Sequence, residues 1–226
     1  MLMTDPKIIV AIDSSNQEQA LNIIDQLDSE LCMIKIGSVN FNSLGNLCIN
    51  KAFERGFKIF LDLKLHDIPN TVKESILGLK HHPISMLTIH TSGGLDMMRA
   101  AVEGVEGTNI KIFGVTALTS LSDNDSERIF RRDIRSQVNS LLDLAEEGGI
   151  DGVVCSPQEL ELLSQRKSLL SITPGIRLKN LQDDQKRVMT PKEAVELGAD
   201  YIVVGRPITS SENISKSLNE IYLSIQ

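Results

Sequence analysis

Residues 58–71 read KIFLDLKLHDIPNT. The first part, Lys58–Leu63, is a short apolar run with the length of a strand buried on both faces. Charged side chains follow at Asp62, Lys64 and Asp67, and a proline then stands where a helix can begin. A buried strand that ends in charged residues and leads into a helix is typical of a β/α unit that carries chemistry.

The same alternation of apolar run and amphipathic stretch continues along the chain. The expected strands are Ile8–Ile12, Met33–Ile36, Lys58–Leu63, Met86–Ile89, Ile110–Thr116, Gly152–Cys155, Leu169–Ile172 and Tyr201–Val204. The expected helices are Gln17–Leu27, Thr71–Lys80, Leu95–Val105, Ile134–Glu147, Pro157–Ser164, Thr190–Leu197 and Asn213–Ile225.

Eight strands in 226 residues give roughly 28 residues per β/α unit. Repeated units of this kind imply right-handed crossovers and a parallel sheet. We therefore predict one domain, residues 1–226, folded as an α/β (β/α)8 TIM barrel. The alternative is an open doubly wound sheet, which a glycine-rich fingerprint after the first strand would favour; residues 13–16 read DSSN and are not one.

The composition of the chain argues against several classes of function. Apolar residues make up 41% of the chain, and 23 Lys+Arg against 30 Asp+Glu give a net charge of −7. This balance argues against a general nucleic-acid or anionic-membrane binder. Four His and three dispersed Cys show no zinc-ligand spacing, and the Cys fit a reducing compartment. With no secretory signal or apolar run of membrane-spanning length, we predict a cytoplasmic protein without a metal site.

A TIM barrel is expected to place its chemistry at the carboxyl ends of its strands. Polar residues fall at these positions repeatedly: Asp13, Lys35, Asp62, Lys64, His90, Thr116, Thr119, Ser156, Arg177 and Arg206. Such a ring of polar strand ends predicts an active site rather than an ordinary surface.

Side chains two apart on a strand share a face, so Asp62 and Lys64 should project together, with Lys35 beside them from the neighbouring strand. Asp13 and Asp67 would complete a cluster of opposite charges. Each pair about 4 Å apart is worth about 4 kcal/mol before desolvation is subtracted. In this cluster Lys64 would be an ammonium able to act as an acid. The alternative is a salt-bridge ladder on the surface.

The loops after the seventh and eighth strands are where barrels commonly bind phosphate. Here they supply Arg177, Gln185, Gly205 and Arg206. Arginine offers a fork of donors and glycine lets the backbone approach a ligand closely. The alternative for Gly205 and Arg206 is an ordinary strand-to-helix turn. The polar stretch Leu178–Met189 could be a lid over a ligand or a plain loop.

With these residues in view, the chain resembles the orotidine 5′-phosphate decarboxylase family over essentially its whole length. The matching segments are DLKLHDIPNTV (62–72), TPGIR (173–177), DQKRVMTP (184–191), VVGRP (203–207), KIG (35–37) and Asp13. The first of these is the most specific.

The resemblance implies decarboxylation of orotidine 5′-monophosphate to UMP, the last step of pyrimidine biosynthesis, without a cofactor or metal. It implies Lys64 as proton donor to C6, Asp62 against the substrate carboxylate, and Lys35 with Asp67 completing the array. It also implies a homodimer in which Asp67 reaches the partner's site. The implied substrate-binding residues are Asp13, Lys35, Asp62, Asp67, Ile68, Asn70, Thr71, Thr119, Pro174, Arg177, Gln185, Gly205 and Arg206. No role is implied for Leu121–Arg135.

The sequence leaves two alternative functions open. One is a Mg²⁺-dependent sugar-phosphate enzyme on the same barrel, resembling 3-keto-gulonate 6-phosphate decarboxylase, which has a carboxylate where this chain has Lys35. A lysine there would repel a divalent cation, so insensitivity to a chelator separates the two. The other is a non-catalytic sensor of a phosphate ligand, which an assay of turnover excludes or supports.

Overall fold

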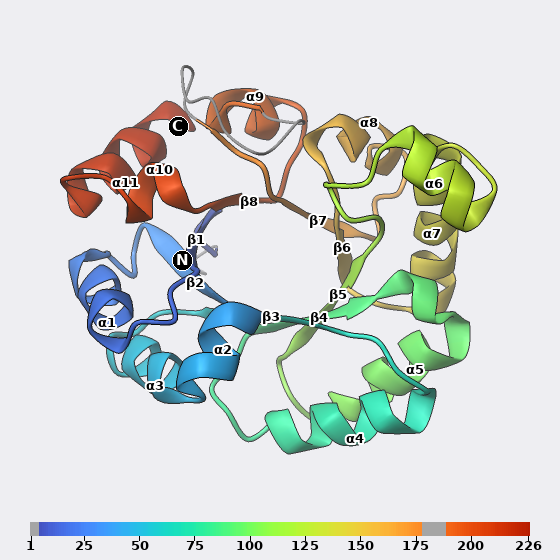
Figure 1. Ribbon diagram of the computed structural model, residues 1–226, viewed down its shortest axis with the longest axis horizontal. Helices are drawn as coiled ribbons and strands as arrows, with labels where there is room; N and C mark the ends of the chain where they lie inside the picture. The colour runs from blue at the N-terminus through green and yellow to red at the C-terminus, as the bar shows by residue number, and fades with distance from the viewer. Residues whose placement is uncertain (1–4, 178–188) are drawn as a thin grey trace.

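A computed structural model describes residues 5–177 and 189–226, and its centre is a closed barrel of parallel strands (Figure 1). The strands pair in chain order and β1 pairs with β8, so the sheet has no free edge. Their bounds are β1 (Ile8–Ile12), β2 (Cys32–Gly37), β3 (Ile59–Leu65), β4 (Met86–His90), β5 (Lys111–Val115), β6 (Gly152–Val154), β7 (Leu170–Thr173) and β8 (Tyr201–Val204). The predicted (β/α)8 barrel is confirmed and the open doubly wound sheet is wrong.

Helices surround the barrel on the outside (Figure 1). They are α1 (Gln17–Gln26), α2 (Ser38–Leu44), α3 (Leu47–Glu54), α4 (Pro69–Leu79), α5 (Leu95–Gly104), α6 (Asp123–Phe130), α7 (Ile134–Gly148), α8 (Leu160–Leu163), α9 (Pro191–Glu196), α10 (Arg206–Thr209) and α11 (Ile214–Ser224), with 3₁₀ turns η1 (Thr91–Gly93) and η2 (Pro157–Glu159). The last helix packs beside the first, where Ser215 Oγ donates to the Gln26 carbonyl at 2.5 Å, and this contact completes the ring.

Alternation along each strand divides the apolar side chains into two cores. In β1, Ile8, Val10 and Ile12 pack against the helices, whereas Ile9 and Ala11 point into the barrel. Such strands read as continuous apolar runs because both faces are buried.

Three aromatic rings pack together inside the barrel, below the carboxyl ends of the strands. Phe113 lies edge-on to both Phe60 and Tyr201, with ring centroids 6.4 Å apart in each pair. This packing closes the interior below the strand ends, so that open space is left at the carboxyl-terminal mouth. Within residues 5–177 and 189–226, no helix is both long enough and apolar enough to cross a membrane.

The structure contains several helices that the apolar pattern did not predict. Helices α2 and α10 are short and have no side-chain cap, so the sequence carries little signal for them. Helix α6 is mostly polar, yet Ser122 and Asp125 form a capping box at its start. This capping box can be recognised in the sequence. The apolar pattern did not predict α6, because the helix has few apolar residues.

Candidate active site

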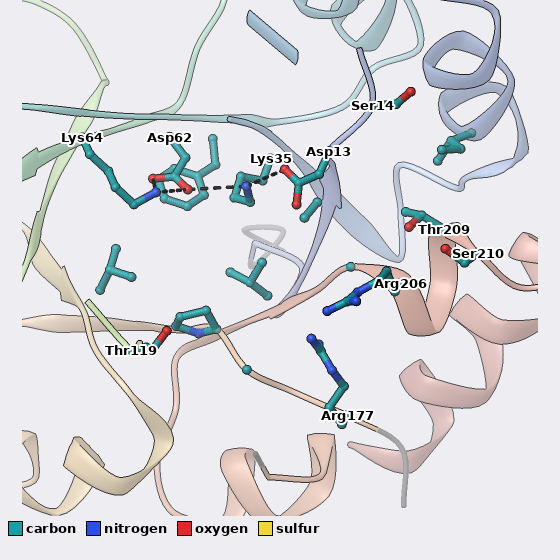
Figure 2. Close-up of a pocket in the computed structure, with 18 of the residues that line it drawn as sticks. Asp13, Ser14, Lys35, Asp62, Lys64, Thr119, Arg177, Arg206, Thr209 and Ser210 are labelled. Atoms are coloured by element: carbon teal, nitrogen blue, oxygen red, sulfur yellow. Dashed lines mark hydrogen bonds and ion pairs between the residues drawn. The ribbon is translucent and has the colours of Figure 1, made fainter. Parts of the chain in front are cut away.

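A cavity of about 530 Å³ opens at the carboxyl ends of the strands (Figure 2). It brings together residues from sequence positions far apart, as the ring of polar strand ends predicted, although His90, Thr116 and Ser156 of that ring do not line it. The predicted residues that line it are Asp13, Lys35, Asp62, Lys64, Thr119, Pro174, Arg177, Gly205 and Arg206. Thr119 lies across the cavity from Asp62 and Lys64 in Figure 2.

Four charged side chains form a row along one wall of this cavity (Figure 2). Lys64 Nζ lies 2.7 Å from both carboxylate oxygens of Asp62. Lys35 Nζ lies 3.4 Å from Asp62 Oδ2 and 3.2 Å from Asp13 Oδ1. Positive and negative charges therefore alternate in the order Lys64, Asp62, Lys35, Asp13. Their charges cancel, which lowers the cost of burying them.

Asp62 is the most enclosed carboxylate of the row, with a side chain 9% exposed. Burial by itself would raise the pKa of Asp62. The charges of Lys35 and Lys64 and the hydrogen bonds from Lys64 and Thr88 outweigh burial, so the pKa of Asp62 lies below its ordinary value. Asp62 is therefore an anion at neutral pH.

Gly37, at the end of β2, leaves space for this row. A Cβ atom at position 37 would lie 3.0 Å from Lys35 Nζ and 3.4 Å from Asp13 Oδ1. A side chain at position 37 would therefore press on the Lys35 ammonium and make it shift. This close approach gives a steric reason for the glycine of the KIG element (35–37).

The backbone of β3 departs from a regular strand where it carries Lys64. Lys64 has φ 53°, in the left-handed region, and the pairing of β3 with β4 shifts between Leu61 and Leu65. The predicted meeting of Asp62 and Lys64 is thus observed, but simple strand alternation does not explain it. An irregular backbone brings the ammonium back onto the carboxylate two residues earlier.

The other end of the cavity is cationic. Figure 2 shows the guanidinium groups of Arg177 and Arg206 pointing toward one another into the open space. Arg177 is 8% exposed, and one of its nitrogens donates to the Ile176 carbonyl at 3.0 Å. A Cβ atom at Gly205 would make only an ordinary 3.8 Å contact with Ala11. The space beside Gly205 is therefore open, and this residue lines the cavity.

Two of the predictions at this end fall where the structure gives no description. Gln185 and residues 178–188 of the expected lid lie outside the described residues. The contact of Gln185 with phosphate and the lid over a ligand therefore stay predictions.

One group of predicted residues does not reach the cavity within the single chain. Asp67, Ile68, Asn70 and Thr71 lie just after β3, at the same end of the barrel, and are exposed. Ile68 is 66% exposed, and Asp67 Oδ1 accepts a local bond from the Ile68 N–H at 2.7 Å. Within a single chain Asp67 therefore does not join the charged row, because the chain turns outward into α4 at this point. Its place in a partner's site stays a prediction.

Several lining residues were not predicted. The apolar wall consists of Ala11, Ile23, Phe60, Val154 and Val203, and polar or glycine positions were missed at Ser14, Gln19, Gly175, Thr209 and Ser210. Three of the apolar residues, Ala11, Phe60 and Val203, stand two positions before a predicted site residue. Strand alternation could have found them. Thr209 and Ser210 belong to the unpredicted helix α10 and its end, so no signal pointed to them.

The charged row does not form a metal site of the usual kind. Among the described residues, no three His, Cys, Asp or Glu side chains converge so as to hold a metal ion. Between Asp13 and Asp62 stands the ammonium of Lys35, with a side chain 11% exposed. A buried positive charge at that point repels a divalent cation.

Comparisons with known proteins agree with this geometry. Residues 6–221 match the model of the orotidine 5′-phosphate decarboxylase / HUMPS family. The chain is 42% identical over 227 residues to an orotidine 5′-phosphate decarboxylase of Saccharophagus degradans, covering 98% of this chain and 95% of that protein. It is 45% identical to one of Actinobacillus succinogenes, covering 98% of each.

A solved structure has the same fold. The orotidine 5′-phosphate decarboxylase of Lactobacillus acidophilus superposes with a TM-score of 0.85 at 37% identity, over 99% of this chain and 100% of that one. Similarity of this extent covers the whole barrel and not a single motif. The chain therefore belongs to the orotidine 5′-phosphate decarboxylase / HUMPS family.

Proposed function

We propose that the chain decarboxylates orotidine 5′-monophosphate to UMP, with Lys64 as the proton donor to C6. One observation carries the proposal: the Lys64 ammonium, held at 2.7 Å by both oxygens of Asp62, shares a cavity with Arg177 and Arg206. A nucleotide can place its phosphate between the two arginines and its base beside the lysine. Apolar side chains of the cavity, among them Phe60, Val154 and Val203, give a pyrimidine ring a surface to pack on.

The residue types fit the chemistry of this reaction. When the C6–CO₂ bond breaks, its electron pair stays on C6 as a carbanion with no adjacent carbonyl to delocalise it fully. The Lys64 ammonium can stabilise this charge and then transfer a proton to C6, leaving a neutral amine that solvent reprotonates. Asp62, an anion beside the leaving carboxylate, would be relieved of repulsion as CO₂ departs. Lys35 and Asp13 would bind ribose hydroxyls.

Consumption of orotidine 5′-monophosphate, followed by ultraviolet absorbance with EDTA present, tests the proposal. We expect turnover that EDTA does not change. No consumption of this substrate, together with Mg²⁺-dependent turnover of a keto-sugar acid phosphate, would instead favour the sugar-phosphate type of decarboxylase. Binding of UMP without any turnover would favour a phosphate-ligand sensor.

Replacement of Arg206 by alanine tests the phosphate end of the cavity. We expect Arg206→Ala to weaken UMP binding by about 10²-fold, because charge-assisted bonds to a phosphate are lost. Uridine has no phosphate, so its affinity should change by less than about twofold. Titration calorimetry of both ligands measures the difference.

Arg135→Ala is the matched control for this variant, since Arg135 pairs with Glu161 on the outer helices. It should leave both affinities unchanged. Equal weakening of UMP and uridine by Arg206→Ala would contradict the assignment to phosphate.

We also propose that two chains form a homodimer in which Asp67 enters the partner's cavity, with Ile68, Asn70 and Thr71 lining the shared part. The support is that these four residues are exposed at the mouth end of the barrel while one of them, Ile68, is a large apolar side chain 66% exposed. A second chain would cover this patch and add a carboxylate to the two lysines.

Mixing of two inactive variants tests the shared site. Asp67→Ala alone should lose about 10²-fold in kcat. If Asp67 serves the partner's Lys64, a mixed dimer of Lys64→Ala and Asp67→Ala chains contains one intact site. Equal mixing with subunit exchange should then restore about a quarter of wild-type activity. No recovery in verified mixed dimers, or a monomer in sedimentation, would contradict the proposal.

We also propose that the chain is a single domain, lies in the cytoplasm and works without a cofactor. Eight β/α units between Ile8 and Ser224 support a single domain. Cys32, Cys48 and Cys155 are free and buried, which supports a reducing compartment and hence the cytoplasm. The charged row within the described residues supports a reaction in which side chains alone stabilise the carbanion.

A further inference from the structure

The backbone at Lys64 is held in an unfavourable conformation. Its φ of 53° is one of two positive values at non-glycine residues in the described part of the chain. The other, Arg131, caps the end of α6, a common place for such a residue. Lys64 instead lies inside a strand, where a left-handed conformation costs about 1–2 kcal/mol. Some neighbouring group must stabilise it.

The strand pairing locates the distortion. Leu61 pairs with Leu87 and Leu65 pairs with Ile89, so β3 advances four residues while β4 advances two. The extra residues bulge from the sheet, and the bulge includes Lys64. Opposite it, between Leu87 and Ile89 on β4, stands Thr88.

The hydroxyl of Thr88 bonds to both functional residues of the bulge. Its Oγ1 accepts the Lys64 backbone N–H at 2.8 Å and donates to Asp62 Oδ1 at 3.0 Å. Thr88 is fully buried, so no water competes for these bonds. A single hydroxyl that accepts once and donates once fits this geometry, and a methyl group would satisfy neither partner.

We infer that Thr88 is a positioning residue for decarboxylation, which fixes the bulge that carries Lys64 and the orientation of the Asp62 carboxylate. This inference rests on the function proposed above. Thr88 does not line the cavity, so it acts through Lys64 and Asp62 and not on the substrate. Its loss should therefore affect the chemical step more than binding.

Thr88→Val tests the inference, because valine keeps the shape and removes the hydroxyl. We expect kcat to fall about 30-fold, since a small displacement of a catalytic group costs one to two orders of magnitude. The affinity for UMP, anchored at the arginine end, should stay within about twofold. Thr88→Ser restores the hydroxyl and should recover kcat to within about threefold of wild type.

Thr91→Val is the matched control. Thr91 is also buried, and its hydroxyl donates to the Val115 carbonyl at 2.8 Å without contact to the charged row. It should lower the melting temperature as Thr88→Val does while leaving kcat unchanged. Should Thr88→Val fail to fold, Thr88→Ala carries the same test, because it removes the hydroxyl without adding a methyl group beside Asp62.

Three results would overturn the inference: wild-type kcat in the hydroxyl-free variant, equal losses of kcat in Thr88→Val and Thr91→Val, or no rescue by Thr88→Ser. The failure of the proposed function is a separate result, since wild-type protein would then not turn over orotidine 5′-monophosphate at all.

Discussion

Lys64→Ala should lower kcat for orotidine 5′-monophosphate by about 10⁵-fold, because it removes both the charge that stabilises the C6 carbanion and the proton that quenches it. The fold should survive. Asp62 keeps a second ammonium, that of Lys35, at 3.4 Å, so no buried carboxylate is left without a cation. Steady-state kinetics at high enzyme concentration, together with a thermal melt, measures both effects.

The control for this variant is Lys51→Ala. Lys51 also forms an ion pair at 2.8 Å, with Asp25, but on the outer helices. It should keep wild-type kcat. Turnover of Lys64→Ala within about tenfold of wild type would remove Lys64 from the chemical step.

Asp62→Asn should lower kcat/KM by about 10³-fold and also reduce the free energy of unfolding by about 2 kcal/mol. The amide keeps the shape of the carboxylate but not its charge. Lys35 and Lys64 would then repel each other across it, and the Lys64 ammonium would lose its ionic partner and one of its two acceptors at 2.7 Å. Kinetics and urea denaturation measure the two losses separately.

A destabilised variant with an intact site separates the two effects of Asp62→Asn. The Asp151 carboxylate accepts the Ile112 N–H at 2.8 Å, just before β6 and therefore at the opposite end of the barrel from the cavity. Asp151→Asn should lower stability without lowering kcat/KM. An Asp62→Asn protein that is less stable yet fully active would show that Asp62 serves the fold alone.

The barrel could be predicted because its strands are buried on both faces and read as uninterrupted apolar runs. Helix α6 could not be predicted in this way, since its polar sequence has few apolar residues to set a period. Ile8–Ile12 and Tyr201–Val204 match the observed β1 and β8 residue for residue. Ends of other strands shift by one or two residues, as in β3, which extends to Leu65.

The charged row could be predicted for a different reason: charged residues at the ends of apolar strands must meet at the mouth of a barrel. The exposure of Asp67 did not follow from this rule, because the chain leaves β3 after Leu65 and turns outward into α4 at Pro69. Thr88 was also beyond prediction. A threonine within the run MLTIH looks like an ordinary strand residue until the register shift between β3 and β4 is seen.

Proton exchange at C6 of UMP isolates the proposed step from the loss of CO₂. By microscopic reversibility, a protein whose Lys64 protonates the C6 carbanion must also be able to remove the C6 proton of UMP. In D₂O, solvent deuterium would then enter C6, and proton NMR would follow the loss of the C6–H signal. We expect exchange with wild-type protein and none above background with Lys64→Ala. Exchange by Lys64→Ala at the wild-type rate would show that another group holds the proton.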